Sequence, residues 1–193
     1  MLALNENYWS QRYEQKSTGW DVGRITTPLK EYFDQLENRA LSILIPGAGN
    51  AYEAEYLHSL GFSKVDVLDF SALPLQSFKQ RNPDWPVERL IQSDFFAWQG
   101  QYDLIVEQTF FCALDPSLRA RYAKHMKQLL KPGGKLVGVL FDAPMNSDQP
   151  PFGGKQEEYK ALFSPYFQFK HWSACYNSIP PRAGKEWFMV LQA

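Results

Sequence analysis

The chain contains little cysteine. Only Cys112 and Cys175 occur in 193 residues, and neither belongs to a Cys-x-x-Cys pair or to a cluster of cysteine and histidine. A disulfide framework or a zinc site needs several such residues at close spacing. We therefore expect two reduced, buried cysteines and no metal site.

An excess of charge and a long hydrophobic run are also missing. The 20 basic and 21 acidic residues leave a net charge of −1, and no stretch collects like charges. This balance excludes a nucleic-acid footprint and a polybasic membrane anchor. Residues 1–16 lack the apolar centre of a secretory signal, and no segment is apolar enough to span a bilayer. We expect a cytoplasmic monomer whose partner is a small molecule.

Short apolar segments that alternate with segments of helical periodicity fill most of the chain. With 45% hydrophobic residues and no internal repeat, 193 residues fit a single domain. Alternating strands and helices predict an α/β fold, in which a parallel sheet is covered by helices on both faces. The expected strands span 41–45, 65–68, 87–91, 102–106, 135–141, 167–176 and 186–191, and the expected helices 52–60, 73–81, 116–130 and 156–163.

The first expected strand is followed by a loop of small residues. In open parallel sheets, ligands bind beyond the carboxyl ends of the strands. In the segment 46–53, Gly47 and Gly49 allow a close approach of the backbone to a ligand, although a glycine turn without a ligand is an alternative. A dinucleotide site requires a third glycine where this chain has Tyr52, which argues against NAD or flavin.

Three further strand ends carry polar residues. Asp69 follows the second strand, about twenty residues after the loop, and a carboxylate there can accept hydrogen bonds from both hydroxyls of a ribose. Alternatively, Asp69 caps the next helix together with Ser71. Ser93 and Asp94 precede two phenylalanines and suit an adenine ring, and Gln108 emerges at the fourth strand end, where a reacting group would lie.

Several longer motifs coincide with one known family. They are Trp9, Arg12 and Tyr13, the run from Gly19 to Gly23, the loop 46–53, residues 109–116 with Arg119, and the segments 130–134, 150–152 and 182–186. On these motifs the chain resembles the thiopurine S-methyltransferase family, in particular its bacterial and plant branch of halide, thiocyanate and thiol methyltransferases. The resemblance covers nearly the whole chain.

The resemblance implies a class I methyltransferase fold, which is Rossmann-like with a mostly parallel seven-stranded sheet. It divides the single domain 1–193 into an N-terminal helical lid, 1–38, and a Rossmann-like core, 39–193. It also implies the cofactor S-adenosylmethionine, held by Trp9, Tyr13, Trp20, Gly47, Gly49, Asp69, Ser93, Asp94 and Gln108. The chain departs from the family at Ala48, at Ala51 and at Gln108, which is arginine in the animal thiopurine enzymes and argues against a thiopurine substrate.

The N-terminal aromatic residues suit this cofactor because an aromatic face attracts the positively charged sulfur that carries the methyl group. Gly19, Asp21 and Gly23 flank Trp20 and favour a mobile lid over a hydrophobic anchor for the first helix. Transfer of the methyl group to an anion needs no base, and we interpret His58, His125 and His171 as structural because none follows a strand end.

A small anionic acceptor needs a positive wall, which Arg182 or Lys185 can supply, although solvated surface positions are the alternative for both. We expect Arg182 to pair with Glu186 at the pocket rim, and Trp20, Gln108, Phe111 and Tyr159 to line the acceptor pocket with Arg182. The sequence thus predicts a methyltransferase acting on a small thiol, thiocyanate, bisulfide or halide. A dinucleotide-dependent oxidoreductase and an inactive, S-adenosylmethionine-binding sensor or scaffold are the alternatives.

Overall fold

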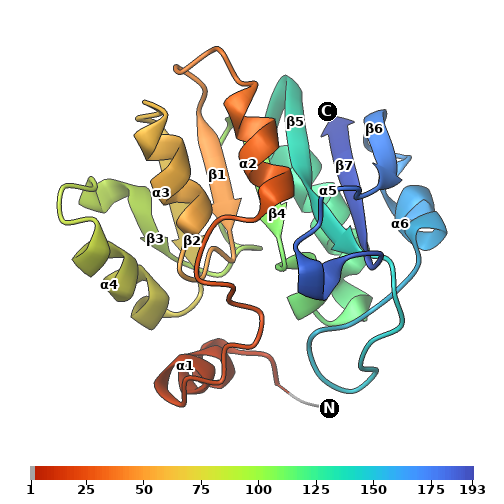
Figure 1. Cartoon of the computed structure of the whole chain (residues 1–193), viewed down its shortest axis with the longest axis horizontal. Helices are drawn as coiled ribbons and strands as arrows, with labels where there is room; N and C mark the ends of the chain where they lie inside the picture. The colour runs from red at the N-terminus through yellow and green to blue at the C-terminus, as the bar shows by residue number, and fades with distance from the viewer. Residues whose placement is uncertain (1–2) are drawn as a thin grey trace.

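Seven strands form one sheet in the order β3-β2-β1-β4-β5-β7-β6 in the computed structural model, which describes residues 3–193 (Figure 1). The pairs from β3 through β5 are parallel, and β7 runs antiparallel to both β5 and β6. This order confirms the predicted α/β class and the mostly parallel sheet. The strands are β1 Ile43–Pro46, β2 Val65–Asp69, β3 Leu90–Gln92, β4 Tyr102–Gln108, β5 Leu130–Phe141, β6 Gln168–Ala174 and β7 Glu186–Gln192.

Helices cover both faces of the sheet because the central strands are apolar on both sides. Alternate residues of a strand point to opposite faces. Accordingly, Ile43 packs in a cluster with α2 (Thr27–Asp34), α3 (Tyr52–Ser59) and α4 (Ala72–Arg81). Its neighbour Leu44 packs in a second cluster with α5 (Arg119–Leu129) and α6 (Gln156–Phe163).

Helix α1 (Glu6–Glu14) has no buried residue and lies apart from these two layers. In Figure 1 it sits below the sheet, at the edge toward which β1 points, whereas the C-terminus lies at the opposite edge. Two hydrogen bonds hold it there, one between the Ser10 and Ser71 hydroxyls at 2.8 Å and one from Gln92 to Glu6 at 3.2 Å. The first helix therefore covers the carboxyl ends of the parallel strands.

Three segments differ from the sequence-based expectations. Helix α2 lies within the lid expected over 1–38, but its Leu29 and Phe33 are fully buried against the sheet, so α2 belongs to the core. Residues 1 and 2 of that lid lie outside the described residues. The strand expected at 87–91 begins as a 3-10 turn, Val87–Arg89, and β5 starts at Leu130 rather than at residue 135.

Within residues 3–193, no helix combines the length and apolarity needed to cross a membrane.

Candidate functional site

A cavity of about 830 Å³ lies between the carboxyl edge of the sheet and α1. Its walls come from the N-terminal segment, the loop after β1, the ends of β2, β3 and β4, the loop after β5 and the turn before β7. The strand-end prediction placed its candidates in one site, and the structure brings most of them together. The predicted residues that line the cavity are Trp9, Tyr13, Trp20, Gly47, Gly49, Asp69, Ser93, Asp94, Gln108, Arg182 and Lys185.

The loop after β1 forms one wall of the cavity through left-handed backbone. Gly47 and Gly49 have φ of +57° and +52°, a region that side chains disfavour. A Cβ atom on Gly47 would come within 2.2 Å of the Phe110 ring, and one on Gly49 within 2.9 Å of the Tyr13 hydroxyl. Glycine at both positions keeps the backbone close to the cavity, as the sequence predicted.

Asp69 holds this loop against the end of β2. One carboxylate oxygen accepts a hydrogen bond from the Gly49 N–H at 2.9 Å, and the other accepts one from the Ser71 N–H at 2.9 Å. Burial raises the pKa of Asp69 to about 6. Ser71 itself caps α4, so the capping role considered for this pair is present. A carboxylate offers about four acceptor positions, which leaves room for ribose hydroxyls as well.

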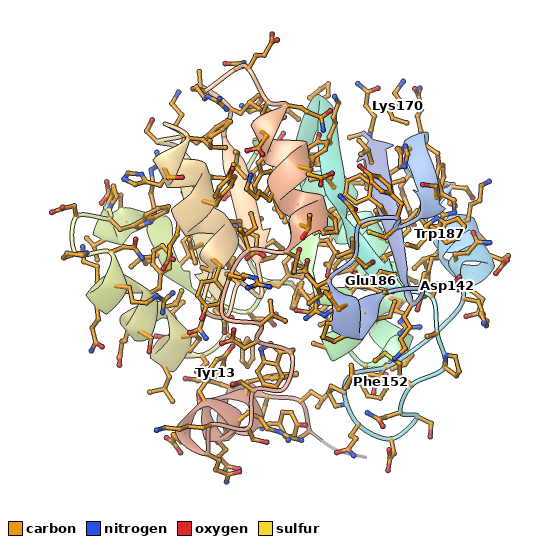
Figure 2. The ribbon with its side chains drawn as sticks, in the orientation of Figure 1. Tyr13, Asp142, Phe152, Lys170, Glu186 and Trp187 are labelled. Atoms are coloured by element: carbon orange, nitrogen blue, oxygen red, sulfur yellow. The ribbon has the colours of Figure 1, made fainter. Side chains whose placement is uncertain are left out.

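Aromatic rings from the N-terminal segment form the roof. The Trp20 ring packs edge to face against Trp9 and Tyr13, with centroid distances of 5.6 and 5.9 Å. Figure 2 shows Tyr13 on the side of α1 that faces the sheet. Burial is the main cause that raises the pKa of Tyr13 far above its usual value, so its hydroxyl stays protonated. The three rings carry no net charge, which suits a sulfonium cation, while Arg12 and Asp21 of the same segment add charges of opposite sign to the cavity lining.

At the end of β4, a side-chain amide faces the cavity with unused hydrogen-bonding capacity. Thr26 donates to the Gln108 Oε1 atom at 2.9 Å, while the Gln108 Nε2 atom is buried and has no partner within residues 3–193. A buried donor without a partner is costly, typically about 1–3 kcal/mol. A ligand atom in the cavity would satisfy it.

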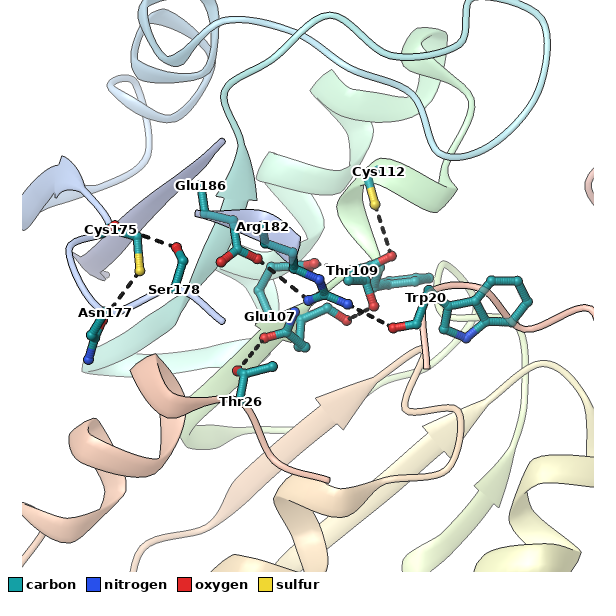
Figure 3. A network of polar contacts seen from close by, with 12 residues as sticks. Trp20, Thr26, Glu107, Thr109, Cys112, Cys175, Asn177, Ser178, Arg182 and Glu186 are labelled. Carbon is teal, nitrogen blue, oxygen red and sulfur yellow. Dashed lines mark hydrogen bonds and ion pairs between the residues drawn. The ribbon is translucent and has the colours of Figure 1, made fainter. Parts of the chain in front are cut away.

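Arg182 connects the roof to the turn before β7. Its guanidinium donates to the Trp20 carbonyl oxygen at 2.7 Å and lies 3.5 Å from the Glu186 carboxylate (Figure 3). Only 7% of Arg182 is exposed, which rules out the alternative of a solvated surface position. The predicted pair of Arg182 and Glu186 is therefore present, while Lys185 is exposed at the rim.

Phe111 and Tyr159 correct the prediction for the acceptor pocket. Both lie outside the cavity lining and are 2% exposed in the core between α5 and α6, where their rings pack edge to face at 5.1 Å. Tyr159 points inward from α6 and donates to the Phe141 carbonyl oxygen at 3.1 Å, and for Phe111 the cause is the left-handed Thr109, with φ of +60°, followed by a 3-10 turn. This turn sends Phe110 toward the cavity and Phe111 into the core.

One buried acid in the cavity was missed by the sequence analysis. Glu53 stands in the first turn of α3, is 7% exposed and lines the cavity, and burial raises its pKa to about 7. An acidic residue in the first turn of a helix is normally explained by the helix dipole. Glu53 ends the glycine-containing segment 46–53, but nothing in that segment indicates whether its side chain is buried.

These residues fit S-adenosylmethionine. The close backbone at Gly47 and Gly49, the acceptor Asp69, the unpartnered amide of Gln108 and the aromatic roof match a ligand with a ribose, polar groups and a cationic sulfur. When bound, this cofactor supplies a methyl group activated by the positive charge of its sulfur.

Comparisons with known proteins agree with this site. Residues 4–189 match the family model described as thiopurine S-methyltransferase. A probable thiol methyltransferase 2 of Arabidopsis thaliana is 30% identical over 185 residues, which cover 92% of this chain and 81% of the plant protein. A thiocyanate methyltransferase 1 of Brassica oleracea is 30% identical over 191 residues, which cover 95% of this chain and 84% of the Brassica protein.

A solved structure shares the fold. The 1,6-didemethyltoxoflavin-N1-methyltransferase of Burkholderia thailandensis, with bound S-adenosylhomocysteine, has a TM-score of 0.78, 18% identity, and coverage of 98% of this chain and 87% of that one. The predicted class I methyltransferase fold is thus confirmed, and of the three function classes considered, the enzyme that transfers methyl groups is the one supported. The chain belongs to the thiopurine S-methyltransferase family and is a methyltransferase that uses S-adenosylmethionine.

Proposed function

We propose that the protein methylates a small sulfur nucleophile or a halide: a thiol, thiocyanate, bisulfide or a halide ion. The observation that carries the proposal is the buried guanidinium of Arg182, which lines the cavity and provides a positive charge for an anionic acceptor. The names of the plant relatives, thiol and thiocyanate methyltransferases, support the same acceptor class.

Under this proposal the chain works by positioning and by excluding water. Gly47, Gly49, Asp69, Ser93 and Asp94 hold the adenosyl part of the cofactor against the strand ends. The remaining cofactor contacts come from Trp9, Tyr13 and Trp20, which cover the sulfonium, and from Gln108, whose free N–H donates into the cavity.

Arg182 holds the acceptor in line with the methyl group. In-line displacement on a sulfonium by an anion cancels two opposite charges, so a site shielded from water favours it. Alignment of the two reactants contributes up to about 7–11 kcal/mol. A halide or thiocyanate is already an anion, so for these acceptors no residue needs to move a proton.

Acceptor profiling tests the proposal. Purified protein is incubated with S-adenosylmethionine and with iodide, thiocyanate, bisulfide or 2-mercaptoethanol, and methylated product and S-adenosylhomocysteine are measured by gas chromatography and mass spectrometry. We expect methylated product and S-adenosylhomocysteine in equal amounts, and a lower rate for Arg182→Met. If none of the four acceptors gave product, the proposed acceptor class would be wrong, although the assignment of S-adenosylmethionine as the cofactor would still stand.

A further inference from the structure

Within residues 3–193, the cavity lining contains one acidic side chain that accepts no hydrogen bond from another residue. Four acidic side chains line it: Asp21, Glu53, Asp69 and Asp94. Asp21 accepts from the Asn50 amide and the Gly23 N–H, Asp69 from two backbone N–H groups, and Asp94 from the Phe96 N–H. For Glu53, its own backbone N–H is the one hydrogen-bond donor found within residues 3–193.

The charges around Glu53 come from three elements. Arg182, in the turn before β7, favours the ionised carboxylate, whereas Asp21 in the roof segment and Glu55 on the same helix disfavour it. Burial is the largest effect and raises the pKa of Glu53 to about 7. Near neutral pH the carboxylate is thus poised to take up and to release a proton.

A thiol acceptor makes a demand that thiocyanate and iodide do not. The nucleophile in sulfur chemistry is the thiolate, and an aliphatic thiol such as cysteine, with a pKa of about 8.5, is mostly protonated at neutral pH. A proton acceptor beside the sulfur solves this problem. His58, His125 and His171 do not line the cavity, so the histidines do not supply it.

We propose that Glu53 is the proton acceptor for thiol substrates of this enzyme, an inference that rests on the proposed acceptor class. The S–H proton passes to a Glu53 carboxylate oxygen, and the electron pair left on sulfur forms the new bond to the methyl carbon. The bond between that carbon and the sulfonium breaks, and its electron pair stays on the cofactor sulfur, which becomes a neutral thioether. Glu53 then releases the proton to water.

The test compares two acceptors in one enzyme. Turnover of thiocyanate and of 2-mercaptoethanol is measured from pH about 6 to about 9 for the wild type, for Glu53→Gln and for Glu55→Gln. Glu55 is a matched control because it lies on the same helix, outside the cavity lining, and bonds Arg81 and Asn82. Calorimetry with S-adenosylhomocysteine verifies that each variant is folded and binds the cofactor product.

At pH about 7 we expect Glu53→Gln to lower kcat for 2-mercaptoethanol about 100-fold or more, and kcat for thiocyanate by no more than about twofold. The loss of kcat for 2-mercaptoethanol should become smaller as the pH approaches the thiol pKa, because the thiolate then forms without a base. Glu55→Gln removes only the weakest of the charges that act on Glu53, so we expect both rates to change by no more than about twofold.

Three results would overturn the inference. Equal losses for both acceptors would mean that Glu53 supports the fold, the cofactor or Arg182, and an unchanged thiol rate would mean that it has no role. If the wild type methylated thiocyanate but no thiol, the proposed proton transfer from a thiol to Glu53 would be excluded. A wild type that methylates neither acceptor would refute the proposed function, which is a distinguishable failure.

Discussion

Glu107 shows how one buried side chain shapes the site. It is fully buried at the end of β4, and its carboxylate accepts hydrogen bonds from the Phe110 and Phe111 N–H groups, both at 2.8 Å, and from the Tyr122 hydroxyl at 2.5 Å. These bonds fix the turn that sends one phenylalanine to the cavity and the other to the core. Burial nevertheless raises the pKa of Glu107 to about 7.

Glu107 gives the protein a pH-dependent stability with a definite sign. Its pKa is raised from 4.5 in the unfolded chain to about 7, so between these values the folded state holds a proton that the unfolded state has lost. Its contribution to stability is complete below pH 4.5 and is lost as the pH rises through about 7. The free energy of unfolding is measured by urea titration at pH about 5 and at pH about 8. Between these two pH values it should fall by about 1–3 kcal/mol less for Glu107→Gln than for the wild type. Equal losses in both proteins would contradict this role.

Among the larger elements, the N-terminal segment joins two parts of the site. Trp20 packs against Trp9 and Tyr13 through its ring and accepts from Arg182 through its carbonyl. Trp20→Ala keeps the carbonyl but removes the aromatic face. We expect the Kd for S-adenosylmethionine to rise about tenfold, because a partly shielded cation–π contact contributes about 1–2 kcal/mol. Calorimetry measures it, Trp20→Phe should retain most of the affinity, and unchanged affinity in the alanine variant would exclude a lid role.

The loop after β5 forms another wall of the cavity, and Arg119 holds this loop in place through hydrogen bonds. Pro150 and Pro151 of this loop line the cavity, and the adjacent carbonyls of Phe152 and Gly153 accept from the Arg119 guanidinium at 3.3 and 3.0 Å. Figure 2 shows Phe152 in this loop at the same edge of the sheet as Tyr13. Arg119 ties the loop to α5, and the Phe152 N–H ties it to the Cys112 carbonyl oxygen at 2.7 Å.

Arg119→Met should loosen that wall without touching the cofactor. We expect the KM for thiocyanate to rise about tenfold, since charged hydrogen bonds contribute about 1.5–3 kcal/mol, while the Kd for S-adenosylhomocysteine stays constant. Arg39→Met is the control. Arg119 stacks on the Phe111 ring at 4.8 Å, and Arg39 similarly stacks on the Phe62 ring at 4.7 Å and bonds the Leu36 carbonyl, but neither Phe62 nor Leu36 adjoins the cavity lining. Parallel changes in both variants would indicate a general loss of stability instead.

The elements also show what the sequence can and cannot predict. The buried strands β1, β2 and β4 and the loop at Gly47 were predictable because apolar runs and glycines report directly on local backbone. The segment beginning at Val87 was not, since this side chain is 72% exposed beside an edge strand that pairs on one side only. Whether Phe110 or Phe111 faces the cavity depends on the left-handed Thr109, and whether Glu53 is buried depends on packing by distant segments. Neither leaves a local pattern in the sequence.

At the scale of the whole molecule, the sheet order explains why residues far apart in the chain share one cavity. The crossover from β3 at one edge to β4 in the centre brings the ends of β1 and β4 side by side. Gly49 and Gln108 then meet residues from both ends of the chain, Trp9 and Arg182. The cavity lining comes from the ends of four parallel strands and from segments near both ends of the chain, so binding of a ligand there should stabilise the entire domain.

Thermal unfolding measures that coupling. A ligand that binds only the folded state, present at about 100 times its Kd, stabilises it by about 2.7 kcal/mol. For a domain of this size we expect S-adenosylhomocysteine to raise the Tm by about 5–10 °C. NAD should cause no shift, because Tyr52 occupies the position where a dinucleotide loop requires glycine. A Tm increase with NAD and none with S-adenosylhomocysteine would contradict the placement of the adenosyl group at Gly49 and Asp69, since the hydrogen bond between these residues ties the cavity to the neighbouring strands β1 and β2.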